Sequence, residues 1–255
     1  MRRLVRSEIR KALSTRVPLV LLVVATAVTV VSLTATAVLA GREIADATMT
    51  PALDTEAGMH ALLASASSGS VLALVLGILG VTGEYRHLTI TQTFLGAPRR
   101  YRVVSAKLLT YLLLGGLFGL VVTAVGLGAG ELALLVAVEP VSPLRGDVAA
   151  ILGGAVLSHA MYTLVGVGVG ALLRNQVVAV VTVVVWTQLV ENMLVGMFPP
   201  VGRWLLTGAS SAVVRYGEST GLALLPVWAG ALLLAGYAAV FGAAAYATTT
   251  RRDVT

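Results

Sequence analysis

Six long apolar stretches, separated by shorter polar ones, dominate the pattern of the chain. They cover residues 17–40, 61–82, 108–135, 148–173, 177–198 and 222–247. Each reaches the roughly 20 residues that a helix needs to cross the hydrocarbon core of a bilayer. The pattern therefore predicts an all-α polytopic membrane protein with six transmembrane helices, folded as a single transmembrane domain over residues 1–255.

The first apolar stretch has a competing interpretation, because a basic segment precedes it and small residues end it, as in a secretory signal peptide. Residues 17–40 are much longer than the apolar core of about 7–15 residues that such a peptide has, so we interpret them as a retained span. In residues 1–16, a helix would place Leu4, Val5, Ile9 and Leu13 on one face among basic side chains. We expect an amphipathic helix in the membrane interface; the alternative is a plain basic flank of the first span.

The composition agrees with a membrane protein. The chain is 57% hydrophobic and only 12% charged, with a mean hydropathy of +0.92, whereas soluble domains carry about 25% charged residues. It has no cysteine and three histidines that are far apart, which excludes thiolate metal sites and gives no metal-binding pattern. We attribute the net charge of +6 to membrane orientation rather than to nucleic acid.

The distribution of basic residues predicts the orientation. With the N-terminus in the cytoplasm, 14 of the 18 basic residues fall in inner segments, as the positive-inside rule expects. Both termini are then cytoplasmic. Residues 199–221 are too polar to span, so we expect an outer re-entrant or interfacial segment before the last span, with Trp204 at headgroup depth.

No catalytic motif accompanies these spans. The sequence lacks a GxxxxGK[ST] phosphate loop, an HExxH zinc motif and a GxSxG nucleophile elbow. Ser158 and His159 are adjacent, but neighbours on a helix diverge by about 100° and cannot form a nucleophile–base pair. We interpret His159 as a packed or cavity-lining polar residue, and the paired glycines of the third and fourth spans as helix-packing positions. The chain is therefore not expected to be an enzyme.

Glu191 is the most unusual residue of the apolar interior, with Gln188 and Asn192 close by on the fifth span. A carboxylate in hydrocarbon is costly and needs a partner, a cavity or water. Two interpretations stand side by side. Glu191, Asn192, Gln188 and His159 form part of a translocation path, or Glu191 makes a structural hydrogen bond between helices.

Residues 83–107 form the most basic interruption between two spans. We attribute its basic part, Arg99 to Lys107, to membrane orientation. Its first part reads Gly83-Glu84-Tyr85-Arg86, followed by Thr89 and the turn 97–100. Together with the six-span layout, this resembles the membrane subunits of bacterial ATP-binding-cassette exporters of the type-2 permease family. Leu88 stands where that pattern usually has glycine.

The resemblance implies a division of labour between chains. A second permease copy or a sister permease would complete the pore, and two copies of a separate ATPase subunit would bind ATP and magnesium, leaving this chain without a cofactor. Residues 83–107 would be the cytoplasmic coupling loop. The chain would sit in the bacterial inner membrane, surrounded by lipid, and move a hydrophobic or amphiphilic substrate outward. The residues implied in ATPase docking are Glu84, Tyr85, Arg86 and Thr89, with a smaller contact at Arg174, Asn175 and Gln176. The alternative is an ATP-independent carrier or channel that uses Glu191.

Overall fold

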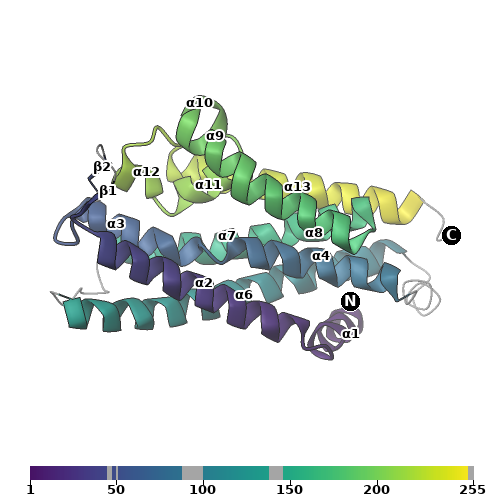
Figure 1. The fold of residues 1–255 in the computed structure, drawn as a ribbon. Coiled ribbons are helices and arrows are strands. Elements are labelled where there is room, and N and C mark those ends of the chain that lie inside the picture. Colours follow the sequence, from purple (N-terminus) through teal and green to yellow (C-terminus); the bar gives the residue numbers. More distant parts are fainter. Residues whose placement is uncertain (45–47, 50, 88–99, 138–145, 252–255) are drawn as a thin grey trace.

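The computed structural model describes residues 1–44, 48–49, 51–87, 100–137 and 146–251, which fold into a bundle of long helices (Figure 1). Six helical segments in these residues are long and apolar enough to cross a membrane. The prediction of a predominantly helical protein with six segments able to span a membrane is confirmed. The six segments are Val17–Leu39, Glu56–Arg86, Tyr101–Leu132, Val148–Leu173, Gln176–Met197 and Val227–Thr249.

The chain begins with a short helix, α1 (Arg2–Leu13), followed by the first span, α2 (Val17–Leu39). Pro18 lies in the first turn of α2, where its missing N–H has no helical partner to lose. Figure 1 shows α1 lying across one end of the bundle instead of extending α2. Its buried positions are Glu8 and Ala12, whereas Leu13 is 65% exposed. The predicted helix is present, but the face that packs on the bundle is centred on a carboxylate.

The second span is interrupted near its start. A small antiparallel ribbon, β1 (Glu43–Ile44) with β2 (Thr48–Met49), precedes α3 (Glu56–Ala64), a single 3₁₀ turn over Ser65–Ser67, and α4 (Ser70–Arg86). The serines at the interruption pair with α2. Thr36 and Ser65 hydroxyls lie 3.0 Å apart, and Ser68 donates a hydrogen bond of 2.9 Å to Ser32. These contacts satisfy polar groups that would otherwise lie unpaired in an apolar bundle.

Helix α7 (Gly146–Leu173) lies at the centre and packs against α4, α6 (Arg100–Ala137) and α13 (Val227–Arg251). Gly166 and Gly170 face Leu74 and Ile78 so closely that an added Cβ would press against the backbone of α4. Gly77 of α4 lies equally close to the backbone of α7 at Thr163. Glycines let backbones approach because they carry no side chain, so the packing interpretation of this glycine pair is confirmed.

The fifth span is not a regular helix. It consists of α8 (Gln176–Val185), a π-helical segment over Trp186–Glu191 and α9 (Asn192–Met197). Three short helices follow at the end of the bundle opposite α1: α10 (Pro199–Gly202), α11 (Leu206–Val213) and α12 (Tyr216–Thr220) (Figure 1). They occupy the predicted segment 199–221, and α11 packs against α13 and α7. The last helix begins at Val227 instead of residue 222, since Pro226 disfavours helix in the residue before it.

The polar segment 83–107 is shorter than the sequence suggested. Helix α4 continues to Arg86 and α6 starts at Arg100, so both helices extend into the segment that the sequence assigned to a loop. Residues 88–99, which include Thr89, lie outside the described residues. The apolar pattern ended the second span too early and began the third span too late, because Glu84 and Lys107 look like loop residues in the sequence. In the fold their charges neutralise each other.

One end of the bundle collects α1, the end of α4, the start of α6, the α7–α8 turn and the last turn of α13 (Figure 1). We call it the basic end. Both ends of the described chain lie here, as an even number of spans requires. Its described basic residues include Arg2, Arg3, Arg6, Arg10, Lys11, Arg16, Arg86, Arg102, Lys107 and Arg174.

Candidate functional site

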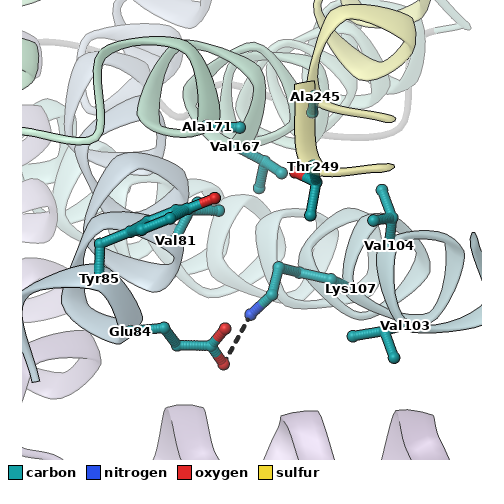
Figure 2. Close-up of a pocket in the computed structure, with 10 residues that line it drawn as sticks. All are labelled: Val81, Glu84, Tyr85, Val103, Val104, Lys107, Val167, Ala171, Ala245 and Thr249. Atoms are coloured by element: carbon teal, nitrogen blue, oxygen red, sulfur yellow. Dashed lines mark ion pairs between the residues drawn. The ribbon is translucent and has the colours of Figure 1, made fainter. Parts of the chain in front are cut away.

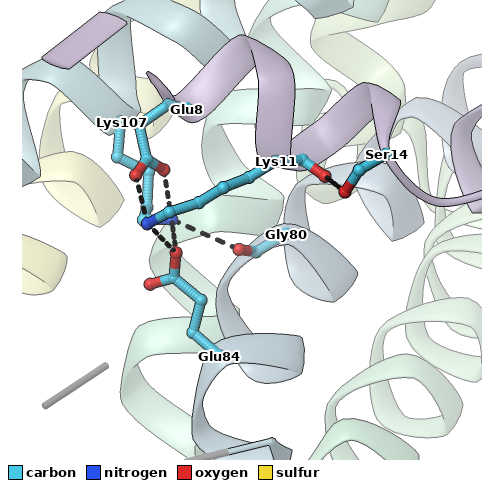
Figure 3. A network of polar contacts seen from close by, with 6 residues as sticks. All are labelled: Glu8, Lys11, Ser14, Gly80, Glu84 and Lys107. Atoms are coloured by element: carbon cyan, nitrogen blue, oxygen red, sulfur yellow. Dashed lines mark hydrogen bonds and ion pairs between the residues drawn. The ribbon is translucent and has the colours of Figure 1, made fainter. Parts of the chain in front are cut away.

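Four charged side chains from three helices meet at the basic end (Figure 3). Lys107 Nζ of α6 lies 2.7 Å from Glu8 Oε2 of α1 and 3.0 Å from Glu84 Oε1 of α4. Lys11 Nζ of α1 lies 2.8 Å from Glu8 Oε1 and 3.1 Å from Glu84 Oε1. Each lysine bridges both carboxylates. We call this group the four-charge cluster; its formal charges balance, and it ties α1 to two spans.

The cluster is largely shielded from solvent. The side chains of Glu8, Glu84 and Lys107 are 5%, 12% and 11% exposed, while Lys11 is 40% exposed. Burial by itself raises the pKa of Glu8, but the charge and hydrogen bond of Lys107, aided by Lys11, bring that pKa below its ordinary value. The two lysines therefore favour the ionised form of Glu8 despite its burial.

Local sequence explains how the cluster assembles. Glu8 and Lys11 are three residues apart on α1, which places them on one helical face. Gly80 lies one turn before Glu84, and an added Cβ there would overlap the ring of Tyr111. This close approach lets Tyr111 pack beside the ammonium of Lys107, whose Nζ lies 5.8 Å from the ring centroid.

The cluster corrects one interpretation and reveals two residues that were missed. Lys107 was attributed to membrane orientation, but it is buried and paired with two carboxylates. Glu8 and Lys11 were not singled out at all. A signal was available, because the chain contains only two lysines among its 18 basic residues and both are in the cluster. Glu84, predicted as a docking residue, points inward, so its carboxylate offers little to a partner.

Two other predicted docking residues come together. The Arg174 guanidinium carbon lies 5.1 Å from the ring centroid of Tyr85, joining the α7–α8 turn to the end of α4. Arg174 has a left-handed backbone with φ of 53°. Asn175 caps α8, its Oδ1 accepting from the N–H of Val178 at 3.2 Å. The two segments that the sequence assigned to one partner are thus in contact with each other.

The remaining docking residues differ in exposure. Arg86 is exposed at the end of α4, and Gln176 is half-buried at the start of α8. Among the described residues, Arg86 makes no recorded hydrogen bond or ion pair. Arg86 and Asn175 are therefore the exposed parts of the predicted surface, and the half-buried Tyr85–Arg174 pair lies between their segments.

Two cavities adjoin the cluster. The first is an apolar pocket of about 30 Å³ between α4, α6, α7 and α13, with the Glu84–Lys107 pair at its edge and Tyr85 above it (Figure 2). It has room for about one water molecule. The second has a volume of about 780 Å³, lies between α1, α4 and α6, and includes all four charged residues and Gln176 in its lining. Only the second is large enough for an organic ligand.

Glu191 lies in the π-helical segment and is 3% exposed. Its Oε1 accepts a hydrogen bond of 2.8 Å from Trp186 Nε1, and its Oε2 accepts one of 2.7 Å from the backbone N–H of Thr207 in the first turn of α11. A carboxylate at a helix N-terminus is electrostatically favourable. These contacts supply the structural hydrogen bond between helices that was one of the two interpretations.

The other members of the predicted translocation path do not gather around Glu191. Gln188 and Asn192 are exposed, and the Asn192 amide donates to the Thr187 and Gln188 carbonyls. His159 is fully buried on α7, with Nδ1 2.8 Å from the Ala155 carbonyl and the Phe118 ring 6.1 Å away. The structure therefore places these four residues in separate environments.

Ser158, the neighbour of His159, accepts a hydrogen bond of 2.9 Å from Ser210. It is therefore engaged away from the histidine. Within the described ranges, no three histidine or carboxylate side chains lie close enough together to hold a metal ion. No protein-family model matches the sequence, and a comparison with curated proteins returned no match either.

Proposed function

We propose that the chain is the membrane-spanning permease subunit of an ATP-binding-cassette exporter and that its basic end docks a separate ATPase. The observation that carries this proposal is the contact between Tyr85 and Arg174. It joins the ends of α4 and α7 into one surface beside the exposed Arg86. Aromatic and arginine side chains are the types that dominate binding energy at protein interfaces.

The four-charge cluster supports a route by which docking would move the membrane domain. Glu84 precedes Tyr85 directly and is bound to Lys107 of α6 and Lys11 of α1. A displacement of the end of α4 is therefore delivered to α1 and α6 together. Coupling needs such a contiguous physical connection between a docking surface and the spans.

The charge distribution supports a cytoplasmic basic end, with both termini inside, in the bacterial inner membrane. The partner ATPase, in two copies, would bind ATP and magnesium, because the sequence has no phosphate loop of its own. A second permease copy or a sister permease would complete the pathway. The substrate class that suits the apolar spans is a hydrophobic or amphiphilic compound moved outward.

Co-purification with a co-expressed ABC ATPase encoded beside this chain tests the proposal. Arg174→Glu should abolish the complex and the ATP-dependent transport. The matched control is Arg203→Glu at the opposite end of the bundle, where the Arg203 guanidinium lies 5.7 Å from the Trp204 ring in a similar stacked pair. The control should leave the complex intact, because its arginine lies on the other side of the membrane.

Two results would oppose the proposal. The first is an unchanged complex and unchanged transport in a folded Arg174→Glu variant. The second is pH-dependent transport by the purified chain alone, lost in Glu191→Gln, which would identify the ATP-independent carrier or channel instead.

A further inference from the structure

The cavity of about 780 Å³ beneath α1 shares Arg86 and the four-charge cluster with the docking proposal, and its lining is of two chemical kinds. The polar part of the lining includes Ser7 and Ser14 beside α1 and Arg86 at the end of α4. The apolar part includes Leu76 and Leu79, which lie earlier on α4 and further from the end of the bundle. An amphiphile would therefore find a matching surface for each of its ends.

The position of the cavity matches that of a lipid headgroup. Helix α1 lies across the end of the bundle, beside the ends of the apolar spans (Figure 1). The cavity also includes Val17 and Pro18, the first residues of α2, in its lining. Exposed apolar side chains begin at this level, with Leu13 65% and Leu19 62% exposed.

The charges around the cavity favour an anion. Each carboxylate of the four-charge cluster is already bound by both lysines (Figure 3). A cationic ligand would have to displace a lysine to reach them. Arg86 lines the same cavity and is exposed, and the surrounding α1 carries further exposed arginines. Basic interfacial segments attract anionic lipids.

We propose that this cavity binds one anionic membrane phospholipid, with its phosphate at Arg86 and its acyl chain along Leu76 and Leu79. The lipid would fill the space between α1 and α4 and hold the interfacial helix in place. The site requires no ATPase, so its test uses the purified chain alone and is independent of the docking proposal.

The experiment counts lipids retained by the purified full chain. The protein is reconstituted in nanodiscs of phosphatidylcholine with graded phosphatidylglycerol, released into mild detergent and analysed by native mass spectrometry. Two variants disturb the cavity. Arg86→Gln removes the charge, and Gly83→Leu fills the space, since an added Cβ at Gly83 meets no atom within 4 Å. Their controls are Arg10→Gln, which removes an exposed charge of α1 outside the cavity lining, and Gly116→Leu, another site where an added Cβ meets nothing within 4 Å.

The expected result is one retained phosphatidylglycerol, preferred over phosphatidylcholine, in the unmodified chain and in both controls. Arg86→Gln should weaken retention at least about tenfold, the size of one charge-assisted hydrogen bond, and Gly83→Leu should abolish it. Equal retention of the two lipids would overturn the proposal. A loss of lipid retention in Arg10→Gln as large as that in Arg86→Gln would also overturn it, because the lipid would then be attracted by the general positive charge of this end and not bound at Arg86. Displacement of the lipid by soluble glycerol 3-phosphate at millimolar concentration would also overturn it, since the apolar part of the lining would then contribute nothing.

Discussion

Replacing Lys107 by methionine should be one of the most destabilising single changes at the basic end. The substitution keeps most of the length and apolar surface of the side chain but removes its charge. Glu8 and Glu84 would then share Lys11 alone. Because both carboxylates are almost fully shielded, the excess negative charge could not be solvated by water without opening the helix contacts.

The magnitude follows from the geometry. Lys107 Nζ lies 2.7 Å and 3.0 Å from its two carboxylate oxygens. At an effective dielectric constant of about 20, each contact has a gross attraction of roughly 6 kcal/mol, and the cost of burying the lysine offsets much of the total. Removing one partner from a buried group of charges has a typical net cost of about 3–5 kcal/mol. Lys11→Met should cost about 1 kcal/mol or less, since Lys11 is 40% exposed and screened by water.

The assay is reversible unfolding of the full chain in mixed detergent micelles, with Glu8→Gln combined with Lys107→Met. In the unmodified chain, Glu8→Gln should lower the free energy of unfolding. In the Lys107→Met background, Glu8→Gln should raise the free energy of unfolding, because it removes one of the two carboxylates that are left to share Lys11. A sign reversal of this kind reports electrostatic coupling and not packing. The reasoning is refuted if Lys107→Met costs no more than Lys11→Met, or if Glu8→Gln is equally destabilising in both backgrounds.

Three further predictions concern other parts of the fold. Glu191→Gln should cost about 1–3 kcal/mol in unfolding free energy. The amide NH₂ that replaces one carboxylate oxygen cannot accept a hydrogen bond from the Thr207 N–H or from the Trp186 indole N–H. Unchanged stability would contradict this structural role of Glu191. Gly77→Ala should destabilise by more than about 2 kcal/mol, since its Cβ would press on the backbone of α7, whereas Gly116→Ala should be neutral or slightly stabilising. Finally, the folded-state pKa of Glu8 lies below its ordinary value of 4.5. Its stabilisation is therefore complete above that ordinary value and is lost as the pH falls through the depressed pKa. Thermal unfolding scans in acid should show this loss, and Glu8→Gln should remove that part of the pH dependence.

Much of the fold could be predicted from local pattern alone. In lipid, a spanning segment must satisfy its backbone hydrogen bonds within itself, so a long apolar run implies a helix. The number of spans and their approximate places followed from this rule. The polar segment 199–221 also stood out, and the structure resolves it into α10, α11 and α12.

The pattern could not predict which face of a helix packs on the bundle, because lipid and protein offer similar apolar surroundings. Helical spacing placed Leu13 on the apolar face of α1, yet it is 65% exposed, while Glu8 on the same helix is buried. Lipid tails are as apolar as leucine, so an apolar side chain gains little free energy by packing inside the bundle instead of facing lipid. Hydrophobic pattern therefore identifies what lies in the membrane, but not which face of a helix meets its neighbours.

The polar contacts were decided by the tertiary structure. Lys107 and Glu8 are 99 residues apart in the chain, and Lys11 and Glu84 are 73 apart. Each looks like an ordinary boundary charge in its own segment. Only the packing of α1 across α4 and α6 brings them within hydrogen-bonding distance. Helix formation depends on neighbours along the chain, so the sequence by itself determined the spans. A buried ion pair depends on the relative position of helices that are distant in sequence, and that position is a property of the whole bundle.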